Sequence, residues 1–415
     1  MTIKVLTDKK IVLGVSGSIA CYKAADLASK LTQAGAQVDV ILTEAAARFV
    51  SPMTFRSLTG RRVYTDMWDL QEHVGHVRLG ETADLLLIAP ATAHTLAKMA
   101  HGLADNVLTV TALAARCTVL VAPAMDGGMY AHPATQANVS LLQERGVVVA
   151  GPGEGRMASG LTGLGRMLEP ETLLGYARQL LGRQGSLSGR KVVVTAGPTR
   201  ESLDPVRFIS NRSSGKQGVA LAQAAVDAGA SVTLIAGPIA GDLPVGAKHV
   251  RVTTANEMLA AVMEAVTGAD VLFMAAAVSD YRPEASSEQK IKKTAQAGDQ
   301  LTVRLARNPD ILEAVKALKG QGGFPRLTVG FAAETSDAVA YGHGKLQRKG
   351  LDLIAVNDVS ASDAGFAVDT NRIILLNASG DSEVWPLLSK AEVADRLVAA
   401  VAALLEVSAG RGSDN

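Results

Sequence analysis

Short apolar runs alternate with amphipathic stretches along the first part of the chain. The amphipathic stretch SIACYKAADLASKLTQAG predicts a helix that stops at a glycine. The apolar runs, most of which end near a Gly or a Pro, are KKIVLGV, AQVDVILT, ADLLLIAPA, CTVLVAPA and GVVVAG. Runs of this length that alternate with helices are typical of a parallel sheet covered by helices on both faces. The pattern therefore predicts an α/β fold.

The same scheme begins again after residue 189. RKVVVTAGPT repeats the pattern of KKIVLGVSGS, and GKQGVALAQAAVDAGASVTLIAG repeats that of the first helix and second strand. Further predicted elements are the strands ADVLFMAAAVSD, LTVGFAAE and LDLIAVND and the helix SKAEVADRLVAAVAALLEV. We predict two tandem three-layer Rossmann-like units with mainly parallel sheets, at residues 1–182 and 190–409. Residues 183–189 form a small polar linker, and residues 410–415 form a disordered tail.

Composition narrows the class of protein. The chain has 415 residues, 48% of them hydrophobic, and a net charge of +1, so no overall field indicates nucleic acid or membrane as a partner. No apolar run reaches the roughly 20 residues that span a bilayer. The N-terminal run resembles a signal peptide but continues into a helix, and we interpret it as a core strand. Two cysteines, Cys21 and Cys117, fit a reducing cytoplasm.

Candidate chemistry in the first half begins at GVSGSIACYK, residues 14–23. A Gly/Ser turn that opens a helix presents backbone N–H groups to a phosphate, although a plain tight turn fits equally well because the stretch lacks GxGxxG. Further on, His73 and His76 have the spacing of a metal pair. Gly75 weakens a helix there, and no third ligand has a recognisable spacing. A single catalytic histidine or a surface histidine are the alternatives.

Several motifs together carry a resemblance over about residues 10–182. GVSGSIACYKAADL, GHVRLGETADLLLIAPATAHT, GLADN, PAMDGGMY and GLGRM occur in the order found in FMN-dependent phosphopantothenoylcysteine decarboxylases. The resemblance implies a flavodoxin-like domain in which flavin oxidises the thiol carbon of the substrate and so provides an electron sink for loss of CO₂. It implies His76 as the base. It implies an FMN cradle formed by Gly14, Ser16, Gly17, Ser18, Thr43, Ala91 and Thr92.

Two residues depart from the pattern of that family. Asp126 stands where the usual PxMN motif has its asparagine, and Ser159 stands where the active-site cysteine is usual. An ionised Asp126 would repel a substrate carboxylate by about 1 kcal/mol in water and about 4 kcal/mol at a protein's effective dielectric. It could instead be protonated, or push the carboxylate towards departure. We expect an active variant; the alternative is a domain that binds flavin and only assembles the oligomer.

The stretch ISNRSSGKQG in the second half indicates an anion site. It is not a Walker A loop, because Ser210 and Gln217 stand where that motif needs Gly and Ser or Thr. A predicted helix begins here, and its N–H groups favour phosphate. A solvated, capped helix is the alternative. The candidate phosphate-binding residues are Ser213, Ser214, Gly215 and Lys216.

The second half resembles the phosphopantothenate–cysteine ligases over about residues 189–407. The motifs AGPTRESLDPVRFISNRSSGKQG, AAAVSDYRP, KIKK, ARNPDIL, VGFAAET and LDLIAVND occur in order. The two halves together resemble the bifunctional bacterial enzymes of coenzyme A biosynthesis. Such a ligase activates a carboxylate as an acyl-nucleotide and releases pyrophosphate, which requires cations and Mg²⁺. The family uses CTP, although nothing in the residues themselves separates cytosine from adenine.

The ligase resemblance also implies individual roles. Asn211 and Arg207 would hold the acyl-nucleotide, Lys290 would be catalytic, and Asp280 would contact nucleotide or Mg²⁺. The implied CTP contacts are Ala276, Ala277, Asp280, Lys290, Pro309, Asp310, Ile311, Leu312, Phe331, Lys345 and Lys349. Asn308 would help to enclose the base and sugar. A solvated KIKK run, which also includes Lys292 and Lys293, and turn-forming Asn and Asp residues are the alternatives.

The expected partners are small molecules, namely phosphopantothenate, cysteine and CTP, with no nucleic acid and no membrane. The resemblance implies a homo-oligomer, a dodecamer of decarboxylase trimers and ligase dimers. A nicotinamide dehydrogenase with two Rossmann halves is a competing hypothesis, but the chain lacks GxGxxG and a suitably placed acidic residue.

Overall fold

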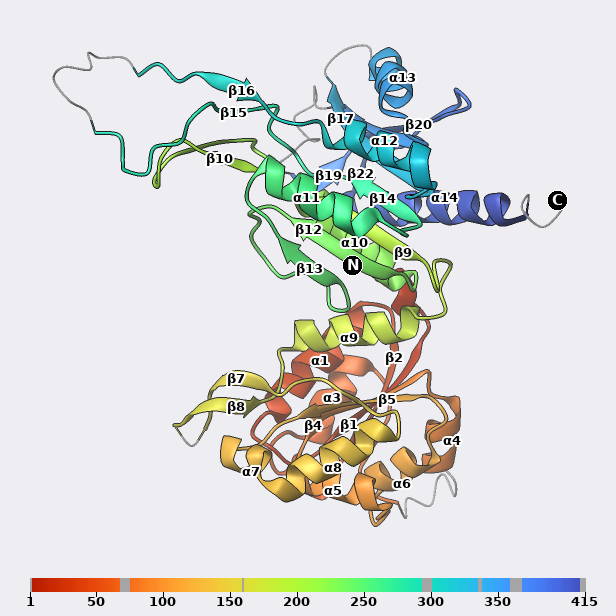
Figure 1. Ribbon diagram of the computed structural model, residues 1–415. Helices are drawn as coiled ribbons and strands as arrows, with labels where there is room; N and C mark the ends of the chain where they lie inside the picture. The colour runs from red at the N-terminus through yellow and green to blue at the C-terminus, as the bar shows by residue number, and fades with distance from the viewer. Residues whose placement is uncertain are drawn as a thin grey trace. The chain divides into compact units, whose positions relative to one another are not determined.

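The computed structural model divides into two compact units, Met1–Gly182 and Arg183–Asn415, which are shown in Figure 1. It describes residues 2–67, 75–158, 160–292, 301–334, 338–358 and 368–410. The predictions for His73, Ser159, Lys293 and residues 411–415 lie outside this range. Each unit is built on a mainly parallel sheet with helices on both faces, so the predicted α/β class is confirmed.

The first unit contains a six-stranded parallel sheet in the order β3-β2-β1-β4-β5-β6. The strands are β1 (Lys10–Val15), β2 (Gln37–Leu42), β3 (Val63–Tyr64), β4 (Leu85–Ala91), β5 (Thr118–Pro123) and β6 (Val148–Val149). The chain moves outward from β1 to β3 and then returns to the other side of β1. The order therefore reverses between β1 and β4, where sheets of this type bind ligands.

Helices cover both faces of this sheet (Figure 1). The buried side chains of one face pack against α1 (Cys21–Gln33), α3 (Pro52–Thr59) and α9 (Pro170–Gly182). The other face packs against α4 (Gly75–Thr82), α5 (Ala93–His101), α6 (Val107–Ala114) and α8 (Pro133–Glu144). Three shorter helices complete the unit: η1 (Lys4–Leu6), α2 (Glu44–Ala47) and α7 (Gly127–Ala131).

An antiparallel hairpin of β7 (Gly153–Arg156) and β8 (Thr162–Arg166) lies beyond the main sheet. Its glycine-rich sequence has no apolar alternation, so the pattern does not predict it. Gly165 has φ +155°, and a Cβ there would lie 2.4 Å from the carbonyl oxygen of Met125. The Met125 N–H donates to the Gly165 carbonyl at 3.0 Å. The hairpin is thus joined to the segment after β5.

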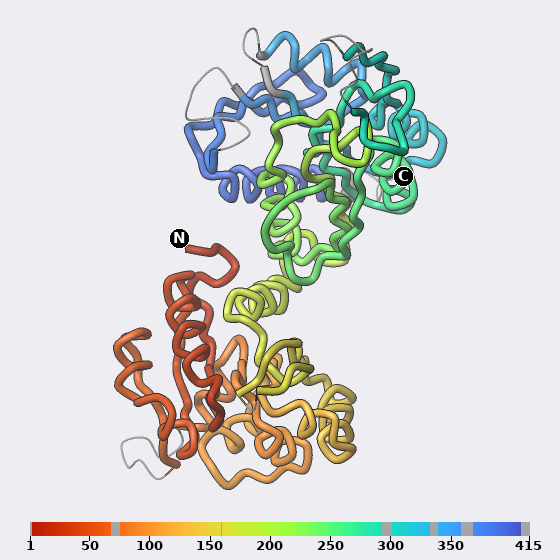
Figure 2. The backbone as a smooth tube through the Cα atoms, turned by 90° about the vertical axis from the view of Figure 1, so that its left-hand side faces the viewer, coloured from red at the N-terminus to blue at the C-terminus, as the bar shows by residue number. Residues whose placement is uncertain are grey.

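The second unit repeats the parallel order in an eight-stranded sheet, β13-β12-β9-β14-β17-β18-β20-β21. Its parallel strands are β9 (Lys191–Ala196), β12 (Ser231–Ala236), β13 (Lys248–Arg251), β14 (Val271–Met274), β17 (Leu327–Glu334) and β18 (Leu353–Asp358). Two antiparallel edge strands, β20 (Ile373–Asn377) and β21 (Ser382–Val384), follow β18. The strand order reverses between β9 and β14. The green-to-blue tube of Figure 2 traces this unit.

Helices again cover both faces. One face packs against α10 (Lys216–Asp227) and α14 (Lys390–Gly410), and the other against α11 (Ala255–Val266), α12 (Ile311–Gly322) and α13 (Ala338–Lys349). Leu187, within the predicted linker, is fully buried in the core of this unit. Three small ribbons are β10 (Arg200–Ser202) with β11 (Phe208–Ser210), β15 (Tyr281–Pro283) with β16 (Leu305–Arg307), and β19 (Thr370–Asn371) with β22 (Leu388–Ser389). Among the described residues, no helix combines the length and apolarity that crossing a bilayer requires.

Candidate functional sites

The predicted flavin residues gather at the carboxyl ends of three neighbouring strands, β2, β1 and β4. Ser16 follows β1 and is almost completely buried. Its Oγ donates to the Pro90 carbonyl at 2.8 Å and accepts from the Thr92 N–H at 3.0 Å. These two bonds hold the turn after β1 against the segment after β4. The Ser16 hydroxyl already makes two hydrogen bonds within the protein. Ser16 therefore contributes to the predicted cradle by holding these two segments together.

Three further hydroxyl groups lie beside helix starts at the same edge. Thr43 Oγ1 accepts from the Ala46 N–H at the start of α2, and Thr92 Oγ1 accepts from the Thr95 N–H at the start of α5. Ser18 Oγ accepts from the Ala20 N–H just before α1. Three helix N-termini, each of which favours an anion, thus surround the strand ends.

The two glycines of the first turn have a packing role. A Cβ on Gly14 would lie 2.3 Å from Leu108 Cδ1 in α6, and a Cβ on Gly17 would lie 2.4 Å from Ala45 Cβ in α2. Both contacts are far closer than real carbon atoms allow. Close approach of helices therefore explains these glycines without a ligand.

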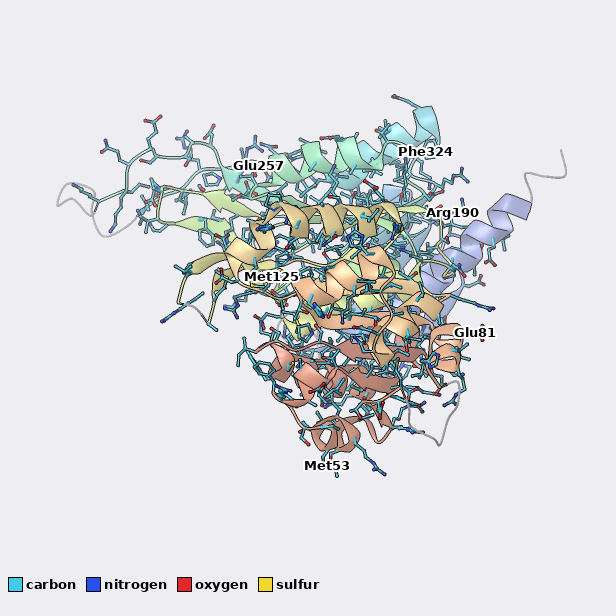
Figure 3. All side chains as sticks on the ribbon, turned by 90° about the horizontal axis from the view of Figure 1, so that it is seen from below. Met53, Glu81, Met125, Arg190, Glu257 and Phe324 are labelled. Carbon is cyan, nitrogen blue, oxygen red and sulfur yellow. The ribbon has the colours of Figure 1, made fainter. Side chains whose placement is uncertain are left out.

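A cleft of about 640 Å³ lies between the start of α1 and the hairpin, and we call it the hairpin cleft. Met125, labelled in Figure 3, is one of its lining residues. Among the described residues, those that line it are Ser18, Ile19, Ala20, Tyr22, Lys23, Ala124, Met125, Asp126, Arg156, Met157, Ala158, Gly165, Arg166 and Met167. It therefore contains two predicted site residues, Ser18 and Asp126.

Asp126 is the N-cap residue of α7. Its Oδ1 accepts from the Gly128 N–H at 3.0 Å. A carboxylate at a helix start is stabilised by the N–H groups that point at it. This contact explains how the segment accommodates an acidic residue where the resembling family has asparagine.

Lys23 is a cleft residue that the sequence motifs do not single out. Its side chain is buried, and its Nζ donates to the Met167 carbonyl at 3.0 Å and to Glu169 Oε1 at 2.7 Å. An amphipathic helix pattern does not say which polar residue turns inward, so only the tertiary structure reveals it.

His76, the predicted base, lies in the first turn of α4. Gly75 is helical as well, and the described part of α4 starts at this residue. His76 does not belong to the described lining of the hairpin cleft. Among the described residues, no group of three or more His, Cys, Asp or Glu side chains could hold a metal ion. The metal pair suggested by the spacing of His73 and His76 cannot be placed, because His73 lies outside that range.

We expect the Ser16→Ala variant to lose flavin affinity. The change removes the hydroxyl partner of the Thr92 N–H, at a cost of about 1–3 kcal/mol, and leaves the Pro90 carbonyl with only its bond from the Ser16 N–H at 3.2 Å, so the two turns of the cradle are joined less firmly. Flavin fluorescence during titration of the apoprotein measures the loss, with Ser29→Ala as the control because Ser29 is bonded to Gln33 on α1. Unchanged flavin binding would show that the hydrogen bonds of Ser16 do not support the flavin site.

The second unit has two adjoining clefts beyond its strand ends. The first, of about 260 Å³, we call the lysine cleft. Its described lining is Ser213, Ser214, Gly215, Lys216, Gln217, Gly218, Ala275, Ala276, Ala277, Val278, Phe331, Ala332, Lys345, Asn357, Asn371 and Lys390. It thus brings together all four predicted phosphate-binding residues. Gly215, the N-cap of α10, has φ +75° and no side chain to occupy the first N–H groups of the helix.

The second cleft, of about 430 Å³, we call the Pro309 cleft. Its described lining is Met274, Ala276, Val278, Ser279, Asp280, Arg307, Asn308, Pro309, Asp310, Ile311, Leu312, Glu313, Phe331, Lys345, Arg348 and Lys349. The two clefts share Ala276, Val278, Phe331 and Lys345. Together they collect every predicted CTP residue except Lys290. One elongated ligand could therefore extend from one cleft into the other.

Each of these clefts has a wall residue with a buried, unpaired oxygen. Ser279 Oγ in the Pro309 cleft and Asn357 Oδ1 in the lysine cleft have no hydrogen-bond partner within the described part of the chain. Buried polar atoms are normally paired. A polar ligand in each cleft would provide a hydrogen-bond partner for the unpaired oxygen atom in its wall.

The contacts of Lys349 differ from those of a free phosphate-binding lysine. Its Nζ donates to Asp310 Oδ2 and to Glu313 Oε1, both at 2.6 Å. Burial alone would lower the pKa of Lys349, but these two bonds outweigh it and the pKa is raised. Lys349 therefore fixes the start of α12 within the Pro309 cleft.

Arg207 and Asn211 lie outside the described lining of both clefts. Arg207 Nε donates to Asp204 Oδ2 at 3.0 Å, and its Nη2 donates to the Ile291 carbonyl at 3.0 Å. The Ile291 N–H also donates to Asp204 Oδ2, at 3.1 Å. The exposed Asn211 donates from Nδ2 to the Ala277 carbonyl at 3.0 Å. Arg207 therefore holds the backbone next to Lys290, while Asn211 reaches the wall of the lysine cleft.

Asp204 is the buried centre of this network, and the sequence motifs give it no role. The Arg207 guanidinium, together with backbone N–H donors, holds the pKa of its carboxyl well below the usual range. A carboxylate with a lowered pKa stabilises the fold above its unfolded-state pKa of about 3.9, and this contribution is lost as the pH falls through the folded-state value.

We expect the Asp204→Asn variant to slow ligation about tenfold, because the segment that carries Lys290 loses a charge-assisted anchor. The stability difference from the native chain should be large at pH 7 and should shrink in strong acid. Thermal unfolding at both pH values and ligase rates measure these effects, with the exposed Asp242→Asn as the control. A constant stability difference across that pH range would show that Asp204 is not the titrating anchor.

Comparison with known proteins defines the class of each unit. Residues 4–182 match the family described as Flavoprotein. Residues 187–405 match the family described as the DNA/pantothenate metabolism flavoprotein C-terminal domain. The chain therefore joins a flavoprotein domain to a pantothenate-metabolism domain.

Relatives that cover nearly the whole chain identify its family. The coenzyme A biosynthesis bifunctional protein CoaBC of Mycobacterium bovis is 47% identical over 408 residues, covering 96% of this chain and 97% of that protein. Its counterpart in Bacillus subtilis is 44% identical, covering 96% and 98%. A crystal structure of a CoaBC C-terminal domain is 36% identical, with a TM-score of 0.45, and covers 54% of this chain and 98% of that domain. From the sequence identities, the chain belongs to the family of coenzyme A biosynthesis bifunctional proteins, which confirms the resemblance found in the sequence.

Proposed function

We propose that this chain converts 4'-phosphopantothenate and cysteine into 4'-phosphopantetheine in two steps. The second unit, residues 190–409, joins the two substrates with CTP. The first unit, residues 1–182, removes CO₂ from the resulting phosphopantothenoylcysteine with FMN. The observation that carries this proposal is that the motifs of two different enzymes lie at the strand-end edges of two separate sheets, in a family named for bifunctional coenzyme A biosynthesis.

The ligation requires activation of a carboxylate. The carboxylate of phosphopantothenate attacks the α-phosphate of CTP, forming an acyl-cytidylate and releasing pyrophosphate. The amine of cysteine then attacks the acyl carbon and releases CMP. Both steps bring anions together, so cations must offset their repulsion. Lys216, Lys345 and the N-terminus of α10 face the lysine cleft and supply this charge.

The described lining of the Pro309 cleft contains three carboxylates, Asp280, Asp310 and Glu313, of which the last two are bonded to Lys349. Mg²⁺ in nucleotide enzymes is commonly held by one or two carboxylates together with the substrate phosphates. Asp280 fits this arrangement, and we propose it as the protein ligand. Lys290, Arg207 and Asn211 would act on the acyl-cytidylate from the neighbouring segments.

The first unit fits a flavin phosphate. Hydroxyl groups and three helix starts meet at the carboxyl ends of β1, β2 and β4, which is where a phosphate is favoured. FMN, when bound, supplies reversible two-electron oxidation of the substrate's thiol carbon. We propose that His76 accepts a proton, and that the ionised Asp126 in the hairpin cleft pushes the substrate carboxylate towards departure. Ser159 stands where a thiol acid is usual, so water or another donor returns the final proton.

A second candidate function is favoured by Asp126 and Ser159. In it, the first unit binds flavin and only assembles the oligomer. Purified protein with FMN and phosphopantothenoylcysteine, but without CTP, separates the two candidates. Released CO₂ at a rate above that of the flavin-free protein supports the enzyme; a yellow protein that releases none supports the binding module.

The ligase half has its own test. Pyrophosphate release is measured with phosphopantothenate and cysteine in the presence of CTP or ATP at equal concentration. We expect release with CTP and a clearly lower rate with ATP. Equal rates with CTP and ATP would support the ligase activity but contradict the preference for cytosine.

We also propose a homo-oligomer in the cytoplasm, a dodecamer of first-unit trimers and second-unit dimers. Large apolar side chains are exposed on both units, including Tyr22 and Met53 on the first and Val206 and Tyr281 on the ribbons of the second. Contacts between copies would cover them. Burial raises the pKa of Cys21 and of Cys117, so both remain thiols at neutral pH, as a reducing compartment allows. Light scattering of the intact chain tests the assembly.

A further inference from the structure

The lysine cleft contains a third lysine, Lys390, which no sequence motif marks. It is the first residue of α14, whereas Lys216 begins α10 and Lys345 lies in α13. Only 7% of Lys390 is exposed, yet the residue lines the cleft together with the other two lysines. Three cationic side chains from three different helices therefore surround about 260 Å³.

The backbone of Lys390 is held in place from two sides. Its N–H donates to the Asp369 carbonyl at 2.9 Å, and its carbonyl accepts from Gln217 Nε2 at 3.2 Å. Gln217 Oε1 accepts from Asn371 Nδ2 at 2.9 Å, and Asn371 Oδ1 accepts from Asn357 Nδ2 at 3.2 Å. This amide chain ties α10, β18 and β19 to the start of α14. The lysine cleft is thus preorganised around Lys390.

Lys390 lies among other charged groups at the lysine cleft. Burial, with repulsion from Lys216, lowers the pKa of Lys390, while attraction from the Asp369 carboxylate partly opposes this. The nearby carboxylate of Asp369 is bonded to Lys216 Nζ at 2.6 Å, and it is largely exposed. Because Lys216, Lys345 and Lys390 line the same cleft, one ligand with several negative charges can contact all three.

We propose that Lys390 binds the polyphosphate of the nucleoside triphosphate in the lysine cleft, beside the N-terminus of α10. Lysine binds phosphate as a point charge, and a helix N-terminus adds N–H donors. The base and sugar then occupy the Pro309 cleft, which shares Phe331 and Lys345 with the lysine cleft. This inference rests on the proposed ligase function and adds a phosphate-binding residue to it.

Calorimetry with two probes tests the inference without turnover. Inorganic tripolyphosphate carries the charge but no base, and CMP carries the base with one phosphate. We expect Lys390→Met to weaken tripolyphosphate binding about 10–100-fold, the range of a lost charged hydrogen bond, and CMP binding less than about threefold. Lys390→Arg should retain most of the tripolyphosphate affinity, because it keeps the charge.

The matched control is Lys319→Met, which removes another partly buried lysine, one paired with Asp352 away from both clefts. It should leave both affinities unchanged. An equal loss for the two probes, or no loss for either, would overturn the role of Lys390. A variant that is merely less stable would lose affinity for tripolyphosphate and for CMP equally. Reduced stability can therefore be distinguished from loss of a phosphate contact. If the native chain binds neither probe and releases no pyrophosphate with any nucleotide, the proposed ligase function fails instead.

Discussion

Replacing Gly218 with leucine should abolish ligation while the flavin unit continues to bind its cofactor. Gly218 lies in the first turn of α10, against the end of β9. A Cβ there would lie 2.5 Å from Ala196 Cβ and 2.7 Å from the Thr195 carbonyl oxygen. Because backbone cannot yield as a flexible side chain does, α10 must move away from the sheet. Overpacking usually lowers the free energy of unfolding by about 1–3 kcal/mol. Because the clash here is with backbone, we expect a loss at or above the upper end of that range.

The consequence for the site follows from what α10 carries. Its start forms one wall of the lysine cleft, so a displaced α10 takes Lys216 and the phosphate-binding N–H groups with it. Pyrophosphate release and flavin fluorescence measure the two units in one sample. The control is Gly320→Leu in α12, where an added Cβ meets nothing within 4 Å. Ligase activity close to that of the control would contradict this account of α10.

The second large effect is expected for Lys345→Met. Lys345 is shared by both clefts of the second unit, and its Nζ donates to the Phe331 carbonyl at 2.7 Å. Loss of one preorganised donor that faces developing charge typically costs about 3 kcal/mol, or about 100-fold in rate. We therefore expect kcat/KM for CTP to fall about 100-fold, with flavin binding unchanged.

Two control variants test whether the effect is specific to the charge of Lys345. Lys319→Met, away from both clefts, should behave as the native chain. Lys345→Arg should recover part of the activity because it keeps the positive charge. A Lys345→Met enzyme with native kcat/KM would show that the nucleotide does not cross from one cleft into the other.

The sequence predicted the fold correctly where a local hydrophobic pattern determines the secondary structure. The core strands β1, β4, β9 and β14 are apolar runs buried on both faces, so their pattern predicts both the element and the parallel sheet. The site motifs follow such strands, and in a parallel sheet strand ends meet at one edge. For this reason the predicted CTP residues other than Lys290, although they are spread over residues 276–349, line two adjoining clefts.

The remainder depends on contacts between distant segments. The hairpin β7–β8 is made of glycine-rich sequence. Strands β20 and β21 pair in antiparallel fashion at the end of an otherwise parallel sheet, and no local periodicity encodes this direction. Asp204 and Lys390 look like ordinary surface residues in the sequence. The structure buries both of them, one beneath Arg207 and the other beside Gln217. Burial of a charged side chain is a tertiary property, so local patterns miss it.

The most direct measurement of the central claim uses cysteine labelled in its carboxyl carbon. The intact chain is given FMN, Mg²⁺, CTP, phosphopantothenate and the labelled cysteine, and labelled CO₂ and pyrophosphate are counted in the same reaction. If one chain performs both steps, the two products reach a ratio of one to one at completion. Pyrophosphate without labelled CO₂ would contradict the account and leave the first unit as a flavin-binding module.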